Sequence, residues 1–277
     1  MASVLKLKLL ERRYNHISYI LVPKELIYNT DINEKRISVY SYFASKQGLD
    51  DTVGFSCNNI VEWCGHKKDY HKNKINEQVT SVIASLEDLS YIKVKGTISA
   101  DMFSVAELDM SKFCPDTQFA LIYFDEIKKI KDFKKYTKDT SKMNTAFLLL
   151  TLSYIRTNML RRQDGYIGDK SSKPEFCYRM YIDIEKDIGL SGRYISRSVK
   201  ILNELDILVS QELPRYQDDD GNWHTEVTMF VNKYRYKRNR IDKEYDYQQE
   251  LQWGKEYIQE KKYLSKKFDQ STERKVK

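Results

Sequence analysis

The residues best suited to metal chemistry lie close together in the sequence, at Cys57, Cys64, His66 and His71. Thiolate and imidazole groups are the ligands that zinc prefers in structural sites. Such sites usually contain two cysteines separated by only a few residues, and Cys57 and Cys64 are farther apart than that. Both cysteines instead fall on one face of an expected helix, where buried thiols are common. We therefore expect no metal and no other cofactor, with a zinc site formed by these residues as the alternative.

Patterns that would indicate catalysis are absent from the sequence. It has no G-x-x-x-x-G-K-[ST] loop, no G-x-G-x-x-G motif and no H-E-x-x-H pair. Asp218, Asp219 and Asp220 are adjacent in an expected turn and project in different directions, which favours a solvated turn over a nuclease metal site. A tyrosine nucleophile would lack a neighbouring H-x-H metal motif. The sequence predicts a binding protein and no enzyme.

Basic side chains concentrate in two short stretches that could contact phosphate groups. Residues 65–74 contain four lysines against one aspartate, and residues 191–200 contain two arginines and a lysine with no acidic residue. The ordinary interpretation of a charged stretch is a solvated surface. Its place in the fold decides whether it indicates nucleic-acid binding, so the elements around both stretches matter.

The same order of predicted elements occurs twice along the chain. The segment Tyr19–Ile27 has a counterpart at Ala120–Lys128, each a short apolar strand followed by an acidic turn and an apolar pair. A helix, a short strand and a short helix follow in both halves. Each short helix ends at or just before a glycine, as helix C-termini often do. The predicted bounds are Glu34–Lys46 and Asn144–Arg161 for the helices, Val53–Phe55 and Tyr178–Ile182 for the strands, and Asn58–Cys64 and Ile184–Ile188 for the short helices.

A longer amphipathic helix and a hairpin complete each half. The apolar residues of the helices repeat at helical spacing, which predicts one buried face on each. A strong turn at Asp218–Asn222 joins strands at Gln211–Tyr216 and Trp223–Val231, and a weaker turn at Gly96–Asp101 leads to a strand at Met102–Leu108. The buried faces comprise Val79, Val82, Ile83, Leu86 and Leu89 in the first helix and Ile195, Val199, Leu202 and Leu205 in the second.

This order of elements is that of the winged helix-turn-helix. We therefore predict an α+β, helix-rich chain with two tandem winged helix-turn-helix domains and a basic C-terminal tail. The domains are expected at residues 1–114 and 115–234, with the linker near residues 109–117. The mixed-charge stretch Asp125–Lys142 joins the first strand of the second domain to its long helix, in which Arg156, Arg161 and Arg162 are expected on the solvent side.

The second helix of a helix-turn-helix enters the major groove by its N-terminal turns, while its apolar face packs on the domain. Polar residues on the outer side of those turns are therefore the expected DNA contacts, and hairpin residues are expected near phosphate or the minor groove. The predicted contacts of the first domain are Lys67, Lys68, Tyr70, Lys72, Lys74, Asn76, Gln78, Lys93 and Lys95. Those of the second are Ser191, Arg193, Tyr194, Ser196, Arg197, Lys200, Arg215 and Tyr216.

Most of the net charge of +7 comes from the tail, since residues 232–277 contain 14 Lys and Arg against 8 Asp and Glu. The tail, residues 235–277, is expected to be a helical arm that docks or binds DNA, or to be mobile, and Leu251, Tyr257, Ile258 and Leu264 would share one helix face. The longest apolar run is too short to cross a bilayer. We expect a cytoplasmic protein with reduced cysteines and no membrane contact.

Two winged-helix units in tandem, an N-terminal strand and a basic tail resemble plasmid and phage replication initiator (Rep) proteins. The resemblance covers about residues 17–231 and rests on architecture. It implies sequence-specific binding of double-stranded DNA at repeated origin sites, contact with host replication proteins, and no ATP hydrolysis. The residues that match the recognition-helix positions are Lys67–Gln78 and Ser191–Lys200. The chain departs from the pattern in the long polar turn before its first long helix.

Two alternatives remain at this point. A transcriptional regulator uses the same fold, and a replication adaptor or helicase-loading factor uses winged helices to contact proteins. The sequence leaves open whether the chain is a monomer or a homodimer.

Overall fold

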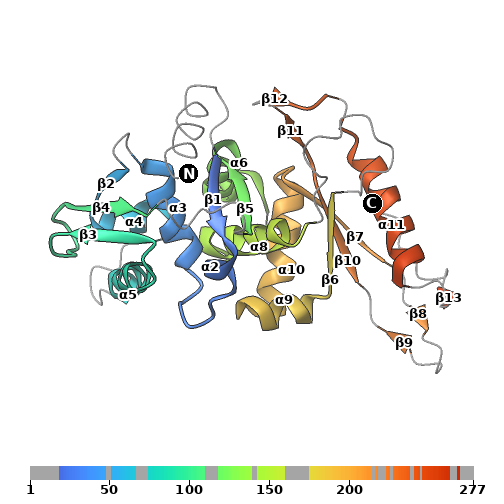
Figure 1. Cartoon of the computed structure of the whole chain (residues 1–277), viewed down its shortest axis with the longest axis horizontal. Helices are drawn as coiled ribbons and strands as arrows, with labels where there is room; N and C mark the ends of the chain where they lie inside the picture. The colour runs from blue at the N-terminus through green and yellow to red at the C-terminus, as the bar shows by residue number, and fades with distance from the viewer. Residues whose placement is uncertain are drawn as a thin grey trace.

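The computed structural model describes residues 19–47, 51–66, 74–109, 118–138, 142–159, 175–213, 216–217, 223–224, 227–237, 240–243, 245–262 and 267–268. About half of these residues are helical and the strands form small sheets, which confirms the predicted α+β, helix-rich class (Figure 1). None of the described helices is both long enough and apolar enough to cross a bilayer.

The first unit, residues 19–109, ends in a three-stranded antiparallel sheet. Its strands lie in the order β2-β4-β3, so the last strand of the unit is in the middle. The elements of the unit are β1 (Tyr19–Pro23), α2 (Lys24–Tyr28), α3 (Arg36–Lys46), β2 (Thr52–Phe55), α4 (Cys57–Trp63), α5 (Lys74–Asp88), β3 (Ile92–Lys95) and β4 (Ser104–Leu108).

The second unit, residues 118–232, follows the same order with one additional short helix and two additional short strands. Its main sheet, β6-β10-β7, again has the last strand in the middle. Its elements are β5 (Phe119–Tyr123), α6 (Phe124–Lys131), α7 (Phe133–Tyr136), α8 (Thr145–Thr157), β6 (Phe176–Arg179), α9 (Tyr181–Ile188), α10 (Gly192–Glu204), β7 (Leu208–Glu212), β8 (Tyr216–Gln217), β9 (Trp223–His224) and β10 (Thr228–Asn232).

The two units are joined through their leading strands. β1 pairs with β5 in an antiparallel register that places Ile20 opposite Ile122. Both side chains are buried, and one continuous hydrophobic core extends from β1 through α3 and α8 to α10. Because the hydrophobic core contains residues of both units, the two units pack against each other as one body (Figure 1).

Local signals explain the start and end of several helices. The Ser56 hydroxyl accepts a hydrogen bond from the backbone N–H of Asn59 at the start of α4, and the Asn144 side chain does the same for Phe147 at the start of α8. α9 ends at Gly189, whose φ of 71° is in the left-handed region that favours glycine. This sharp end turns the chain directly into α10.

Three local predictions need correction. α9 begins at Tyr181, which the sequence pattern assigns to the preceding strand, because an apolar pair before a short helix fits either element. The stretch Asp125–Lys142 contains two helices, α6 and α7, with Ile127, Ile130 and Phe133 buried. Arg156 is only 5% exposed and not on the solvent side, since its guanidinium pairs with Glu126 inside the protein. The other two arginines expected on that side, Arg161 and Arg162, lie outside the described residues.

The C-terminal tail contains the helix α11 (Tyr247–Lys262), which covers the outer face of the β6-β10-β7 sheet (Figure 1). Leu251 and Ile258 are buried there against Phe176 and Met229, and Tyr257 packs beside them. Part of the tail is therefore a docked helix. Short strands β11 (Tyr236–Lys237) and β12 (Arg240–Ile241) form a hairpin before it, and β13 (Lys267–Phe268) pairs with β8 after it.

Candidate nucleic-acid interface

α10 has one buried face and one polar face. Ile195, Val199 and Leu202 are buried in the core. On the other side, Arg193, Ser196 and Lys200 are exposed, and Arg197 is partly exposed beside them. The spacing of Arg193, Arg197 and Lys200 places the three cationic side chains on one stripe along the first three turns of the helix.

The start of α10 is fixed by α9. The Glu185 carboxylate accepts a hydrogen bond from the backbone N–H of Gly192 at 2.9 Å, and a Cβ at Gly192 would lie 3.0 Å from that carboxylate. Asp187 accepts a hydrogen bond of 2.5 Å from the Tyr154 hydroxyl of α8. Two of the three acidic residues of α9 thus form hydrogen bonds within the structure, Glu185 with the start of α10 and Asp187 with α8.

Of the predicted contacts at this helix start, Tyr194 is partly internal and Ser191 is exposed. The Tyr194 ring is tilted against the Phe147 ring, with their centroids 4.6 Å apart, and packs on the core. Ser191 is the exposed N-cap residue, and its side chain makes no capping hydrogen bond. Tyr194 therefore joins α10 to α8 while its neighbours face solvent.

α5 occupies the corresponding position in the first unit. Val79, Val82, Ile83 and Leu86 are buried, and Lys74 and Gln78 are exposed. The Asn76 side chain is half-buried and donates a hydrogen bond to the Asn58 side chain of α4 at 3.2 Å. Lys67, Lys68, Tyr70 and Lys72 lie outside the described residues. The polar side of α5 is less basic than that of α10, since Glu77 and Glu87 are exposed on the same helix.

The hairpins differ between the units. In the first, Lys93 and Lys95 are exposed on β3, and Lys95 forms an ion pair of 3.0 Å with Glu107. In the second, β8 pairs with β9 beyond the main sheet, and β13 of the tail adds a third strand beside β8. Tyr216 begins β8, whereas Arg215 and the turn residues 218–222 lie outside the described residues. The β8-β9 hairpin lies at the lower right of Figure 1.

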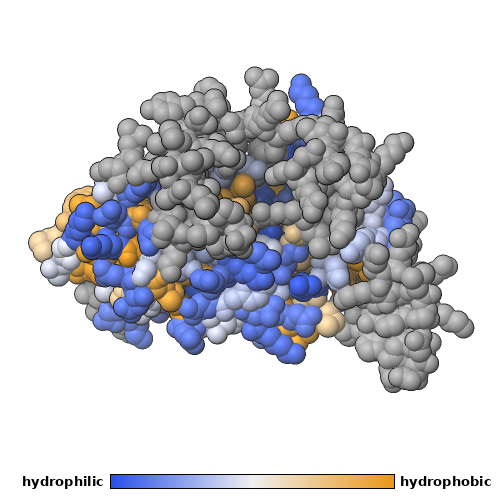
Figure 2. Space-filling model, in the orientation of Figure 1, coloured by the Kyte–Doolittle hydropathy of each residue, from blue (hydrophilic) through white to orange (hydrophobic). Residues whose placement is uncertain are grey.

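The loop of the first hairpin is tied to α4 by backbone hydrogen bonds. The N–H groups of Cys57 and Asn58 donate to the carbonyls of Ser99 and Ala100, at 3.1 and 3.0 Å. Directly after this loop, Met102 and Phe103 are 65% and 73% exposed. Hydrophobic residues gather at the left end of Figure 2, over this hairpin, whereas the lower edge near α5 and α9 is mainly hydrophilic.

The cysteine and histidine cluster has buried thiols. The Cys57 Sγ contacts the Thr80 hydroxyl at 3.4 Å, and burial raises the pKa of its thiol. Burial raises the pKa of Cys64 to about 12, so this thiol stays protonated. Burial also lowers the pKa of His66 to about 4. No three His, Cys, Asp or Glu side chains of the described residues converge on a metal position, and His71 lies outside those residues.

Sequence reasoning missed the buried arginines that hold this arrangement. Arg36 of α3 reaches the last residue of α9, and Arg156 of α8 pairs with Glu126. At the start of α6 the Glu126 carboxylate accepts a hydrogen bond from the backbone N–H of Tyr123, but the N-cap residue is a tyrosine, so the sequence lacks the S/T-x-x-E pattern that signals such a start. A comparison with protein-family models, curated proteins and solved structures finds no match to this chain.

Proposed function

We propose that the chain binds double-stranded DNA in a sequence-specific manner through two tandem winged helix-turn-helix units and acts without a catalytic step. Each unit has the order helix, strand, helix, helix, strand, strand, with the last strand in the middle of its sheet and with β8 and β9 inserted before it in the second unit. That order supports a winged-helix assignment. The domain bounds of 1–114 and 115–234 belong to the same proposal, and all but the first residue of the linker proposed near residues 109–117 lies outside the described residues.

The observation that carries the proposal is the cationic stripe of α10. Arg193, Arg197 and Lys200 lie on one side of a helix whose other side is in the core. Arginine reads guanine in the major groove through two hydrogen bonds, and lysine binds phosphate. The β8-β9 hairpin, which extends beyond the main sheet of the second unit, would serve as the wing of this domain in the proposal.

Salt-dependent binding to duplex DNA tests the proposal. Each neutralised phosphate contributes about −0.9 to the slope of log affinity against log salt, so several contacts produce a steep line. The duplex probe is a sequence selected by the purified chain from a random library. Absence of duplex binding at low salt would refute the proposal.

A matched pair of variants locates the contact surface. Arg193→Ala should weaken binding to the selected site by about 1–3 kcal/mol and relax the preference at one base pair. Lys128→Ala is the control, because Lys128 is an exposed cation on α6, at the opposite edge of Figure 1 from α9. Equal weakening by the two variants would show a diffuse charge effect and no base reading.

We further propose that the biological role is replication initiation for a plasmid or phage, with host replication proteins as partners. This role rests on the architectural resemblance alone. Sequencing the DNA recovered with the protein separates it from transcriptional regulation. Directly repeated sites beside an AT-rich segment support initiation, and a palindrome next to a promoter supports regulation.

A second candidate function, a replication adaptor acting through protein contacts, is favoured by the first hairpin. Met102 and Phe103 are exposed there, and Val105 on the outer face of the sheet is 40% exposed. The equivalent face of the second sheet is covered by α11. Exposed apolar groups of this kind often mark protein contacts. Replacing Phe103 with Ser should abolish partner capture and leave duplex binding unchanged if this function is correct.

A further inference from the structure

Arg36 is a fully enclosed arginine whose five N–H donors are all used. Its side chain is 1% exposed, and each hydrogen bond goes to a backbone carbonyl. Nε donates to Leu26 at 2.9 Å, and Nη1 donates to Ile32 and Asn33. Nη2 donates to Ile27 at 2.8 Å and to Ile188 at 3.1 Å. An arginine has five such donors, so this set is complete.

The acceptors of Arg36 explain why a buried cation is stable here. Leu26 and Ile27 belong to the last turn of α2, and Ile188 is the last residue of α9. Carbonyls at helix C-termini lack partners within the helix and carry partial negative charge. Burial lowers the pKa of Arg36 to about 10, so it remains charged at neutral pH. The guanidinium therefore joins the ends of two helices from different units.

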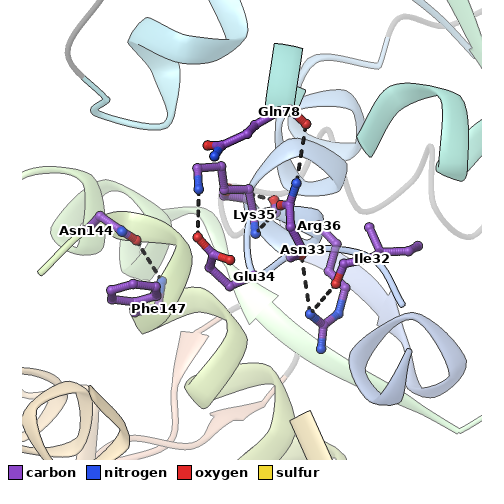
Figure 3. Close-up of polar contacts among 9 residues, drawn as sticks. Ile32, Asn33, Glu34, Lys35, Arg36, Gln78, Asn144 and Phe147 are labelled. Atoms are coloured by element: carbon purple, nitrogen blue, oxygen red, sulfur yellow. Dashed lines mark hydrogen bonds and ion pairs between the residues drawn. The ribbon is translucent and has the colours of Figure 1, made fainter. Parts of the chain in front are cut away.

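The segment before Arg36 contacts α5 and the turn that leads into α10. The Asn33 side chain donates a hydrogen bond to the backbone carbonyl of Gln78 in α5 at 3.4 Å (Figure 3). Thr30 lies beside Gly189, where an added Cβ would be 3.4 Å from its Cγ2. Gly189 is the first residue of the turn between α9 and α10. Residues 29–36, here called the strut, thus run from α5 to the α9-α10 turn.

We propose that the strut fixes the relative placement of α5 and α10, with Arg36 as its main positioning residue, and so sets the spacing of the DNA sequences that the chain accepts. The inference rests on the proposed function and adds a specific set of residues to it. Arg36 contacts no nucleic acid in this proposal. It acts by holding Ile188, and with it the turn that starts α10, at a set place relative to the first unit.

Arg36→Lys is the informative substitution. Lysine keeps the charge but has three donors on one nitrogen, so it cannot serve carbonyls that lie around a planar guanidinium. The shared core and the β1-β5 pairing still hold the units together. The expected defect is a loss of precision in the α9-α10 turn. Asn33→Ala, which removes the contact with Gln78, is the second variant and has a smaller expected effect.

Arg156→Lys is the matched control. Arg156 is also a buried arginine, on the helix of the second unit that corresponds to α3, and it donates hydrogen bonds to Leu121, Glu126 and Asn232 of that unit. Its replacement should lower stability without changing the relation between α5 and α10. Circular dichroism and urea unfolding establish that each variant is folded.

The experiment measures the affinity for the selected duplex and for versions with one base pair inserted between the regions protected by α5 and α10. In the wild-type chain the insertion should weaken binding about tenfold or more, because one helix loses its base contacts. Arg36→Lys should reduce that insertion penalty about threefold or more. Its affinity for a duplex that carries only the α10 region should equal that of the wild-type chain.

The outcomes are distinguishable. If the wild-type chain binds no duplex, the proposed function and the strut both fail. If it binds and tolerates the insertion, or if Arg36→Lys and Asn33→Ala both keep the full insertion penalty, only the strut is overturned. An equal change in Arg156→Lys also overturns it, because the effect is then a general loosening. If Arg36→Lys does not fold, Asn33→Ala decides the question.

Discussion

Replacing Arg156 with methionine should show how much the buried ion pair between Arg156 and Glu126 contributes to the free energy of unfolding. Arg156 and Glu126 are 6% and 7% exposed at their side chains, and two hydrogen bonds of 2.5 and 2.6 Å join them. Removing one partner of a buried pair costs about 3–5 kcal/mol, because the remaining charge has no compensation. Arg156 also donates to the Leu121 carbonyl at 2.8 Å, which would lose that donor. We expect a loss of about 4 kcal/mol in the free energy of unfolding.

Urea unfolding followed by circular dichroism measures this loss by linear extrapolation. The double variant Glu126→Gln with Arg156→Met removes the uncompensated charge. The substituted glutamine side chain would still accept the hydrogen bond from the backbone N–H of Tyr123 that Glu126 accepts now. The double variant should therefore regain about 1–3 kcal/mol relative to Arg156→Met. A loss below about 1 kcal/mol in the single variant, the value of an exposed pair, would refute the reasoning, as would a double variant no more stable than the single one.

Further predictions concern α10, its preceding turn and His66. Leu202→Ala should cost about 2–5 kcal/mol of unfolding free energy because the side chain is fully buried; a urea midpoint equal to that of the wild-type chain would contradict this. Gly189→Ala should cost about 1 kcal/mol, checked by thermal unfolding, because φ is 71° there and the new methyl group would contact Thr30. The pKa of His66 is about 4 in the folded state and near 6.5 in the unfolded state, so the unfolded chain binds the extra proton between these values. Unfolding free energy should therefore fall as pH drops from about 6.5 to 4, and His66→Gln should show a flatter profile over that range.

The parts of the fold that were predictable have strong local periodicity. The apolar stripes of α5 and α10 each identify a buried face, and the residues predicted on those faces are buried or partly buried. A period of three to four residues is a local property of the sequence. It can therefore be recognised without knowing which segments pack against the helix. The polar side of α10 follows from the same stripe, which is why the sequence identifies Arg193 and Lys200 as exposed.

The parts that were not predictable depend on contacts between distant segments. α8 is buried along its whole length, so no apolar stripe indicates where Arg156 points. Arg36 looks like an ordinary helix-surface arginine, and its acceptors belong to α2, the strut and α9. The sequence could not predict whether the tail docks. Leu251 and Ile258 hold a helix in place only if an apolar sheet face lies opposite them, and that face is formed by strands distant in the sequence.

The pairing of β1 with β5 has a consequence for the timing of folding. Ile20 lies opposite Ile122, which is synthesised roughly a hundred residues later. During synthesis the first unit therefore leaves the ribosome with β1, an apolar strand, unpaired. Contacts between such distant positions slow folding, since a long loop must close before they contribute. The first unit can therefore complete the pairing of its leading strand only after β5 of the second unit has been synthesised.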